Sequence, residues 1–200
     1  MMMTNDTNSP PNPGPFATMA DEALVQQVQK SLQGQTAFAE LYRRHVNQVY
    51  RYLLARVGNE QDAQDLTAQT FLAALEAIPT FRGKSKFSSW LLGIARHRVG
   101  DHFRKQRPTA PLEQAEDVVD DVPSPDEAVD KQLRLEQVMK VLPILSTERA
   151  EALALHSFGG LDVSQVAQIM EKSEAAVRML IHRAIRDLKQ RLRVDLQERA

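Results

Sequence analysis

The sequence contains no cysteine and no long apolar run. Without cysteine the chain has no disulfides, thiolate nucleophiles or cysteine-ligated zinc, and it suits a reducing compartment. No apolar stretch approaches the roughly 20 residues that are needed to span a bilayer. Residues 1–20 also lack the basic start and the apolar core of a secretory signal. These absences predict a cytoplasmic protein that does not enter a membrane.

Length and composition fit two small domains. A chain of 200 residues exceeds one minimal domain, and its 42% hydrophobic and 26% charged residues lie in the globular range. Apolar residues recur at spacings of three and four, whereas alternation at period two is missing over any useful length. The sequence therefore predicts an all-α fold of two small helical domains joined by a flexible acidic linker.

The expected domain boundaries follow from changes of composition along the chain. Residues 1–20 are rich in proline and asparagine and have almost no large apolar group, so we expect a disordered tail. Residues 21–107 are expected to form the first helical domain, and residues 128–200 the second. Between them, residues 108–127 contain prolines and acidic residues but no lysine or arginine, which predicts the flexible linker.

Helix-end signals divide the two domains further. Gly34 separates the first two helices, Gly58 and Asn59 lie between the second and the third, and Pro79 ends the third. The apolar side of the third helix is expected to consist of Leu66, Phe71, Leu72, Leu75 and Ile78. Further helices are expected over 88–107 and 128–142, after a Ser146 cap, from Val163 and from Glu174.

The segment 80–107 is strongly basic and contains the single tryptophan. It has eight lysine and arginine residues and only one acidic residue, Asp101. On a helix, one face would hold Trp90, Ile94, His97, Asp101 and Arg104, flanked by Arg98 and Lys105, while Leu91, Ala95 and Phe103 turn toward a core. Cations neutralise phosphates and planar side chains receive unstacked bases, so this block favours binding of single-stranded or melting DNA. The alternative is a solvated basic face with Trp90 as a core aromatic.

The order of residues in this block resembles region two of the extracytoplasmic-function (ECF) sigma factors of RNA polymerase. The resemblance rests on Phe81-Arg82-Gly83, Trp90-Leu91, Ile94-Ala95-Arg96 and Asp101. In that family the loop and helix hold the −10 promoter element open and capture a flipped base of the non-template strand. The resemblance implies base capture by Lys84, Ser85 and Lys86 and −10 reading by His97, Asp101 and Arg104. The basic aromatic face itself adds Trp90 and Lys105 as expected DNA contacts. His97 stands where the family usually has asparagine.

The helix after Asn59 is similar to the family helix that docks on the largest subunit of core RNA polymerase. This part of the resemblance covers Asp62–Leu72 and implies a polymerase-binding surface of Asp62, Asp65 and Gln69. Acidic and amide oxygens there would accept hydrogen bonds from basic residues of the partner. From the residues alone, Asp62 in the first helical turn also suits the helix dipole without any partner.

Residues 161–193 have the pattern of a helix-turn-helix. Asp162 and Gln165 form a capping box, and Ser173 caps a second helix after a short turn. One side of the second helix is apolar, and the other presents Glu174, Arg178, Met179, His182 and Arg186. The first turns of such a helix face base edges in the major groove, which makes Arg178 the predicted base reader and Met179 a contact for a thymine methyl group. For Glu174, complementarity to the helix dipole is the preferred interpretation.

This segment also resembles region four of the same family, through Ala176-Val177-Arg178 and His182-Arg183-Ala184. Region four reads the −35 promoter element as duplex, which implies a DNA surface of Ser173, Arg178, Met179, His182 and Arg183. Glu171 occupies the turn position where glycine is frequent, and Met179 and Leu180 replace residues that are often polar or basic. Together the matches cover about residues 21–195. For the acidic linker, the resemblance implies a path toward the polymerase channels, whereas composition alone fits a plain tether equally well.

The resulting prediction is a non-catalytic sigma factor whose partners are core RNA polymerase and promoter DNA. The resemblance adds an anti-sigma factor as a candidate partner, and no metal or cofactor is expected. One alternative is a helix-turn-helix regulator that binds duplex DNA without polymerase, but it leaves the basic block 80–107 unexplained. A second alternative is an enzyme using one of the five histidines, but the sequence has no nucleophile elbow, phosphate loop or metal-spaced ligand set.

Overall fold

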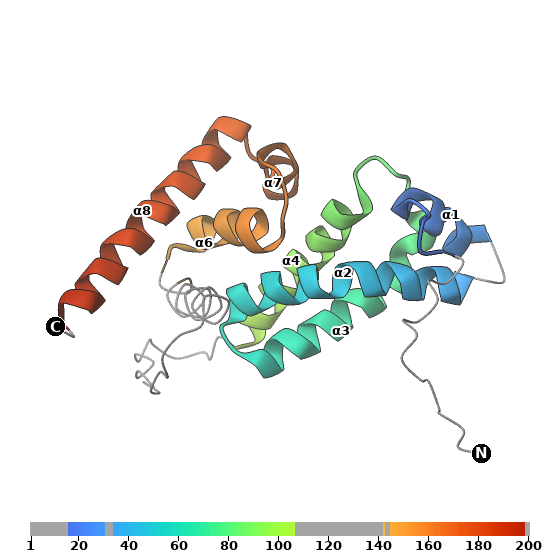
Figure 1. The fold of residues 1–200 in the computed structure, drawn as a ribbon, viewed down its shortest axis with the longest axis horizontal. Helices are drawn as coiled ribbons and strands as arrows, with labels where there is room; N and C mark the ends of the chain where they lie inside the picture. Colours follow the sequence, from blue (N-terminus) through green and yellow to red (C-terminus); the bar gives the residue numbers. More distant parts are fainter. Residues whose placement is uncertain (1–15, 31–33, 107–141, 143–144, 199–200) are drawn as a thin grey trace, which may run out of the picture.

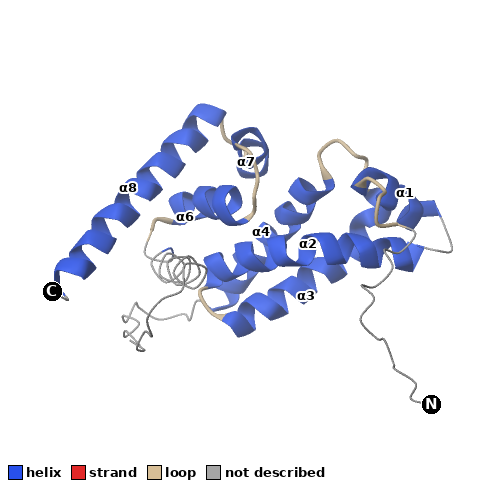
Figure 2. Cartoon of the chain, in the orientation of Figure 1, coloured by secondary structure: helices blue, strands red, loops and turns tan. Residues whose placement is uncertain are grey.

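The computed structural model describes residues 16–30, 34–106, 142 and 145–198. Its elements are α1 (Asp21–Lys30), α2 (Gly34–Val57), α3 (Glu60–Ala77), the 3₁₀ turn η1 (Ile78–Thr80), α4 (Phe87–Gln106), α6 (Thr147–Leu153), the π-helical segment η3 (Ala154–Phe158), α7 (Val163–Met170) and α8 (Glu174–Glu198). All regular structure among the described residues is helical (Figure 2). The predicted all-α class is therefore confirmed. The linker 108–127 and most of the predicted helix 128–142 lie outside the described residues.

Helices α1–α4 form an N-terminal bundle, and α6–α8 form a C-terminal unit beside it (Figure 1). In the bundle, α2 packs against α1, α3 and α4. The predicted boundary between α2 and α3 is confirmed: Gly58 has a positive φ of 78°, and the Asn59 side chain accepts a hydrogen bond from the backbone N–H of Asp62. Glycine adopts this left-handed backbone without the steric cost that other residues meet.

The predicted apolar side of α3 is wrong at two positions. The buried residues of this helix are Ala63, Leu66, Thr67, Thr70, Phe71 and Ala74, which recur at spacings of three and four. Leu72 and Leu75 lie outside this stripe and are 59% and 44% exposed. In α4, Leu91 and Ala95 are buried as expected, but Phe103 is 40% exposed. Each helical step turns the side chain by about 100°, so apolar neighbours of a buried residue can face water.

The end of the predicted N-terminal tail differs from the expectation. Phe16 is buried, and Arg44 on α2 donates hydrogen bonds to the carbonyl oxygens of Phe16, Ala17 and Met19 over 2.7–3.0 Å. Arg44 also pairs with Asp21 at 2.9 Å. A guanidinium has five donors in a fixed fork, which allows one side chain to satisfy several acceptors. Residues 16–20 therefore belong to the folded bundle.

The C-terminal unit contains the predicted helix-turn-helix. Asp162 and Gln165 form the reciprocal capping box at the start of α7. Glu171 ends α7 in the left-handed conformation, with φ 55° and ψ 42°. Ser146 occupies the expected N-cap of α6, but its side chain makes no capping hydrogen bond. Arg149 on α6 and Asp187 on α8 form an ion pair at 2.5 Å that ties these two helices together.

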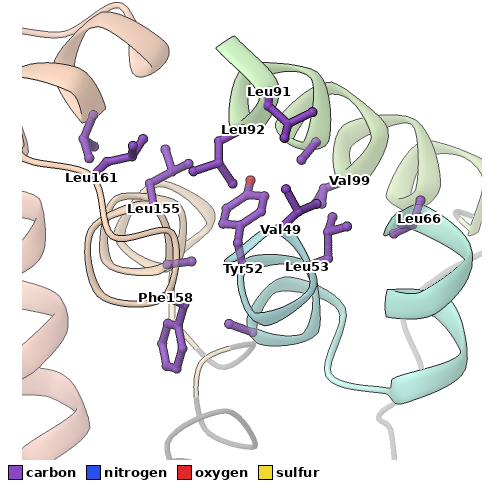
Figure 3. Packing of buried hydrophobic residues seen from close by; sticks show 14 of the residues in the cluster. Val49, Tyr52, Leu53, Leu66, Leu91, Leu92, Val99, Leu155, Phe158 and Leu161 are labelled. Carbon is purple, nitrogen blue, oxygen red and sulfur yellow. The ribbon is translucent and has the colours of Figure 1, made fainter. Parts of the chain in front are cut away.

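The two units share one continuous apolar cluster. Figure 3 shows Leu155 and Leu161 of the C-terminal unit facing Leu92 of α4 and Tyr52 of α2. Two small domains on either side of the linker were expected from length and composition, and buried side chains on α2 and α4 form one cluster with those of the second unit. Of the helices that the structure describes, none combines the length and apolar character needed to cross a membrane.

Candidate nucleic-acid interface

The loop 81–86 presents the first group of predicted DNA-binding residues. It connects η1 to α4 and turns at Gly83, whose φ is 67°. Gln29 of α1 fixes the start of the loop, because its side-chain amide donates to the carbonyl oxygens of Ile78 at 2.8 Å and Phe81 at 3.0 Å. Lys84 and Lys86 are exposed. Both ammonium groups can therefore approach a phosphate from solvent.

Trp90 lies at the junction between the loop and the core. Its ring centroid is 4.9 Å from that of Phe81 and 5.6 Å from that of Phe87, and its side chain is half-buried. Tilted aromatic packing at these separations stabilises a core beyond simple burial. Trp90 thus packs against the aromatic residues at both ends of the loop, while part of its ring stays exposed. A role in the core and a role in base stacking are therefore compatible.

The remaining strip of α4 faces outward. His97, Arg104 and Lys105 are exposed, and Asp101 is half-buried. Arg104 forms an ion pair with Asp101 three residues earlier. Since exposed pairs of this kind are worth only about 0–1 kcal/mol, a phosphate or a base edge can displace the carboxylate at small cost. The predicted −10 residues therefore share one accessible helical face.

The second predicted DNA surface lies on α8. Ser173 caps this helix by accepting a hydrogen bond from the backbone N–H of Ala176 at 3.2 Å. The exposed face beyond the cap holds Arg178, Met179, His182 and Arg183. Arg178 pairs with Glu174 at 2.7 Å, so Glu174 has a side-chain partner in addition to its place in the first helical turn. Met179 is 49% exposed, so its apolar side chain is accessible to a thymine methyl group.

The predicted polymerase-binding residues occupy one stripe of α3. Asp65 and Gln69 are exposed, and Leu72 continues their stripe by helical spacing. Asp62 is more engaged within the chain: Asn59 donates to its carboxylate at 2.6 Å, and His102 Nε2 lies 3.4 Å from it. The stripe therefore combines two exposed polar groups with an exposed apolar group.

The pKa of one carboxylate of the helix-turn-helix is influenced by the charge of the lysine loop. The pKa of Asp162 is lowered mainly by the backbone N–H of Gln165, which donates to it, and by the hydroxyl of Ser164. The positive charge of Lys86 lowers it further. The capping end of α7 thus lies near a predicted DNA-binding residue of the first unit. No cluster of potential metal ligands occurs among the residues for which the structure gives positions.

Sequence reasoning missed the polar residues between the two units. Tyr52 and Arg56 of α2 and Glu151 of α6 are buried together. One feature of the sequence indicated them. Arg56 continues the helical spacing of the buried residues Val49, Tyr52 and Leu53 on α2. A charged side chain on a buried stripe requires a buried partner. The local sequence did not indicate which residue this partner is, because Glu151 lies far away along the chain.

Comparisons with known proteins identify both units. Residues 41–109 match the family model Sigma-70 region 2, and residues 135–188 match Sigma-70, region 4. The chain is 34% identical over 178 residues to the ECF RNA polymerase sigma factor BldN of Streptomyces coelicolor, which covers 87% of this chain and 67% of that protein. It is 30% identical over 171 residues to the ECF RNA polymerase sigma factor SigC of Mycobacterium tuberculosis, covering 82% of this chain and 88% of that protein.

A solved structure agrees with these sequence matches. The structure of CnrH in complex with the cytosolic domain of CnrY has a TM-score of 0.67 and 25% identity to this chain, and the match covers 88% of this chain and 98% of that one. Both helical units thus have counterparts in one known protein.

Proposed function

The chain belongs to the extracytoplasmic-function (ECF) sigma factors of RNA polymerase, and on this premise we propose that it reads promoters through two DNA surfaces of different kinds. As a sigma factor it directs transcription initiation. It binds core RNA polymerase, which supplies the chemistry of RNA synthesis, while the chain itself catalyses nothing. Acting with that enzyme places it in the cytoplasm.

The first surface binds the −10 element as a melted strand. It consists of the loop lysines Lys84 and Lys86, with Ser85 between them, and of the outward face of α4. Its support is the combination of exposed cations with the half-open Trp90 beside the loop. Phosphates of an unpaired strand would lie along the cations, and an unstacked base would leave the duplex toward the loop.

The second surface binds the −35 element as duplex. The exposed face of α8 has the distribution expected of a recognition helix, with Arg178 and Met179 near its start and His182 and Arg183 farther along. Arg178 would leave Glu174 to bind a guanine edge bidentately, and Met179 would contact a thymine methyl group.

The coexistence of these two surfaces on one chain is the observation that supports the proposal most. A regulator that only binds duplex DNA would use α8 and would have no role for exposed lysines around a tryptophan on α4. The stripe of Asp65, Gln69 and Leu72 on α3 supports docking to the core enzyme, with polar acceptors around an exposed apolar group. An anti-sigma factor as a further partner stays a prediction.

Single substitutions distinguish the two surfaces. Arg178→Ala should weaken use of the −35 element by about 1–3 kcal/mol and relax sequence preference there, because one base-edge contact is lost. Lys84→Ala/Lys86→Ala should instead reduce strand opening, measured by permanganate reactivity of unpaired thymines, and a promoter with a pre-melted −10 element should restore part of the loss.

Two matched controls accompany these variants. Arg43→Ala removes an exposed arginine that pairs with Glu40 at 2.7 Å, as Arg178 pairs with Glu174, but on α2. Lys30→Ala removes an exposed lysine at the end of α1. Both should initiate like the parent. The assignment is wrong if the lysine variant opens intact duplex as well as the parent, or if Arg178→Ala fails even on pre-melted promoters.

A further inference from the structure

The side chain of Gln29 on α1 is bonded to the backbone at the start of the loop 81–86. Figure 1 shows α1 beside the loop that leads into α4. The Gln29 amide donates to the carbonyl of Ile78 at 2.8 Å and to that of Phe81 at 3.0 Å. These bonds join residues that are 49 and 52 positions apart in the sequence. One side chain of a separate helix therefore fixes the place at which the loop begins.

The other end of the loop is supported from the start of the same helix. Asp21, the first residue of α1, has a carboxylate oxygen 2.6 Å from His45 Nε2 on α2. The ring of His45 packs against that of Phe87, the first residue of α4, with their centroids 5.4 Å apart. Both rings are buried. Helix α1 thus supports the loop directly at one end and through α2 at the other.

Between these ends the loop has little packing of its own. Arg82, Gly83, Lys84 and Lys86 are exposed. Gly83 has a φ of 67°, and a side-chain carbon added there would meet no atom within 4 Å. A segment with so few contacts opens locally at low cost, and glycine adds backbone freedom. The conformation of the loop therefore depends on how its ends are held.

The bond from Gln29 also affects the aromatic side chains below the loop. Phe81, whose carbonyl Gln29 holds, has its ring 4.9 Å from that of Trp90 and 6.2 Å from that of Phe87. A shift of the backbone at Phe81 would move this ring against Trp90. The same shift would move the loop lysines, because they follow Phe81 directly in the chain. Gln29 is thus connected to both parts of the surface that is proposed to receive an unpaired strand.

We propose that Gln29 is a positioning residue for sequence reading at the −10 element, acting through the loop 81–86 rather than by touching DNA. The inference rests on the proposed function. An amide nitrogen has two N–H donors, and the carbonyls of Ile78 and Phe81 use both. A loop held in one conformation offers one shape to an unstacked base. A loop that samples several conformations accepts different bases more equally.

Sequence preference measured with the full chain and core polymerase tests this role. The probe is a promoter library that is randomised at the upstream and the downstream element, and run-off transcripts are sequenced. Preference at each position is the ratio of transcript yields for the best and the worst base. Gln29→Met keeps the length of the side chain but has no donor. It should lower the preference about fivefold at one or two downstream positions, because a hydrogen bond that holds the loop is lost, and leave upstream preferences unchanged.

Two further variants of α1 accompany this one. Gln26→Met is the matched control, since it makes the same exchange at an exposed position of the same helix, and it should behave like the parent. Gln29→Lys returns a donor to the two carbonyls and should recover most of the lost preference. Circular dichroism checks that each variant is folded. If Gln29→Met is unfolded, Gln29→Asn takes its place, because its amide is one methylene too short to reach both carbonyls.

Trp90 gives a local signal that is independent of transcription. It is the only tryptophan of the chain and lies against Phe81, so its fluorescence reports on the start of the loop. Quenching of this fluorescence by acrylamide in the free chain should rise in Gln29→Met and stay at the parent value in Gln26→Met. Unchanged quenching in Gln29→Met would contradict the proposed hold on the loop.

The transcription results separate this inference from simpler explanations. Preference lost only at the downstream element, and regained in Gln29→Lys, supports the positioning role. An equal loss of yield on every promoter, with all preferences intact, shows that Gln29 only stabilises the bundle and overturns the inference. A parent-like profile of Gln29→Met, or a lysine variant as unselective as the methionine variant, overturns it as well. If the parent chain itself yields no transcripts or shows no downstream preference, the proposed function is wrong, and this inference with it.

Discussion

Replacing Glu151 with alanine should destabilise the folded chain by about 3 kcal/mol. The substitution leaves the Arg56 charge buried without its counter-charge and removes the acceptor of the Tyr52 hydroxyl. Breaking a buried pair in this way costs about 3–5 kcal/mol in other proteins. The lower end applies because separation of the two units would give Arg56 access to water and limit the loss.

A double-mutant cycle separates the two interactions of Glu151. Tyr52→Phe removes one hydrogen bond to a charged group, worth about 1.5–3 kcal/mol, and fills the same volume apart from the oxygen. Combined with Glu151→Ala, it should show a coupling energy of about 1 kcal/mol or more, because the two side chains touch at 2.6 Å and each substitution removes their hydrogen bond. Burial, the Glu151 charge and its hydrogen bond raise the pKa of Tyr52, so the hydroxyl stays a donor at ordinary pH.

Urea unfolding followed by circular dichroism measures these free energies. Glu148→Ala is the reference, because its exposed pair with Lys172 should contribute less than about 1 kcal/mol. A loss below about 1 kcal/mol for Glu151→Ala, or no difference from Glu148→Ala, would refute the inference that this carboxylate stabilises the contact between the units.

Three further predictions concern the separate surfaces. Asp62→Lys/Asp65→Lys should weaken binding of core polymerase about tenfold in a titration while the helical signal stays unchanged, because the charge of the α3 stripe is reversed. The lowered pKa of Asp162 means that its cap stabilises the fold above the ordinary value of 3.8 and that this contribution is lost as pH falls through the lower folded value. In Asp162→Asn the side chain can still cap the helix but does not ionise. The free energy of unfolding of this variant should therefore not fall with the protonation of residue 162 at acidic pH. Glu171→Gly should raise the free energy of unfolding by up to about 1 kcal/mol, because glycine adopts the left-handed φ of 55° without a steric cost. A thermal melt that shows no gain for Glu171→Gly would contradict this.

The local parts of the fold were predictable because their signals are local. A helix expected over 88–107 is found at Phe87–Gln106, and the caps at Asn59, Asp162 and Ser173 make the expected backbone hydrogen bonds. These bonds join residues three positions apart, so a short stretch of sequence contains all the atoms that matter.

The wrong predictions of burial concern apolar residues that lie next to the buried stripe of a helix. On α3, Leu72 and Leu75 are apolar neighbours of buried positions, and the spacing alone did not show that Phe71 and Ala74 face the core in their place. Phe103 of α4 is likewise exposed although it is apolar. On α3 the exposed leucines continue the stripe of predicted polymerase contacts. Apolar residues in excess of what the core needs are therefore informative about surfaces.

The contact between the units could not be predicted from the sequence. Tyr52 and Glu151 are separated by 99 positions, and Gln48 and Gly159 by 111. Neither Glu151 nor Gly159 belongs to a local pattern that names its partner. Only Arg56 gave a signal, because a charged residue on the buried stripe of α2 requires a polar or charged partner.

Reconstitution with core RNA polymerase tests the central claim most directly. The core enzyme alone, and the core enzyme with this chain, would each be given a library of promoters that vary at both elements, and run-off transcripts would be sequenced. We predict that specific transcripts appear only with the chain and that the selected promoters share both an upstream and a downstream element. Tight binding of duplex DNA by the chain, with no transcript that depends on it, would contradict the account.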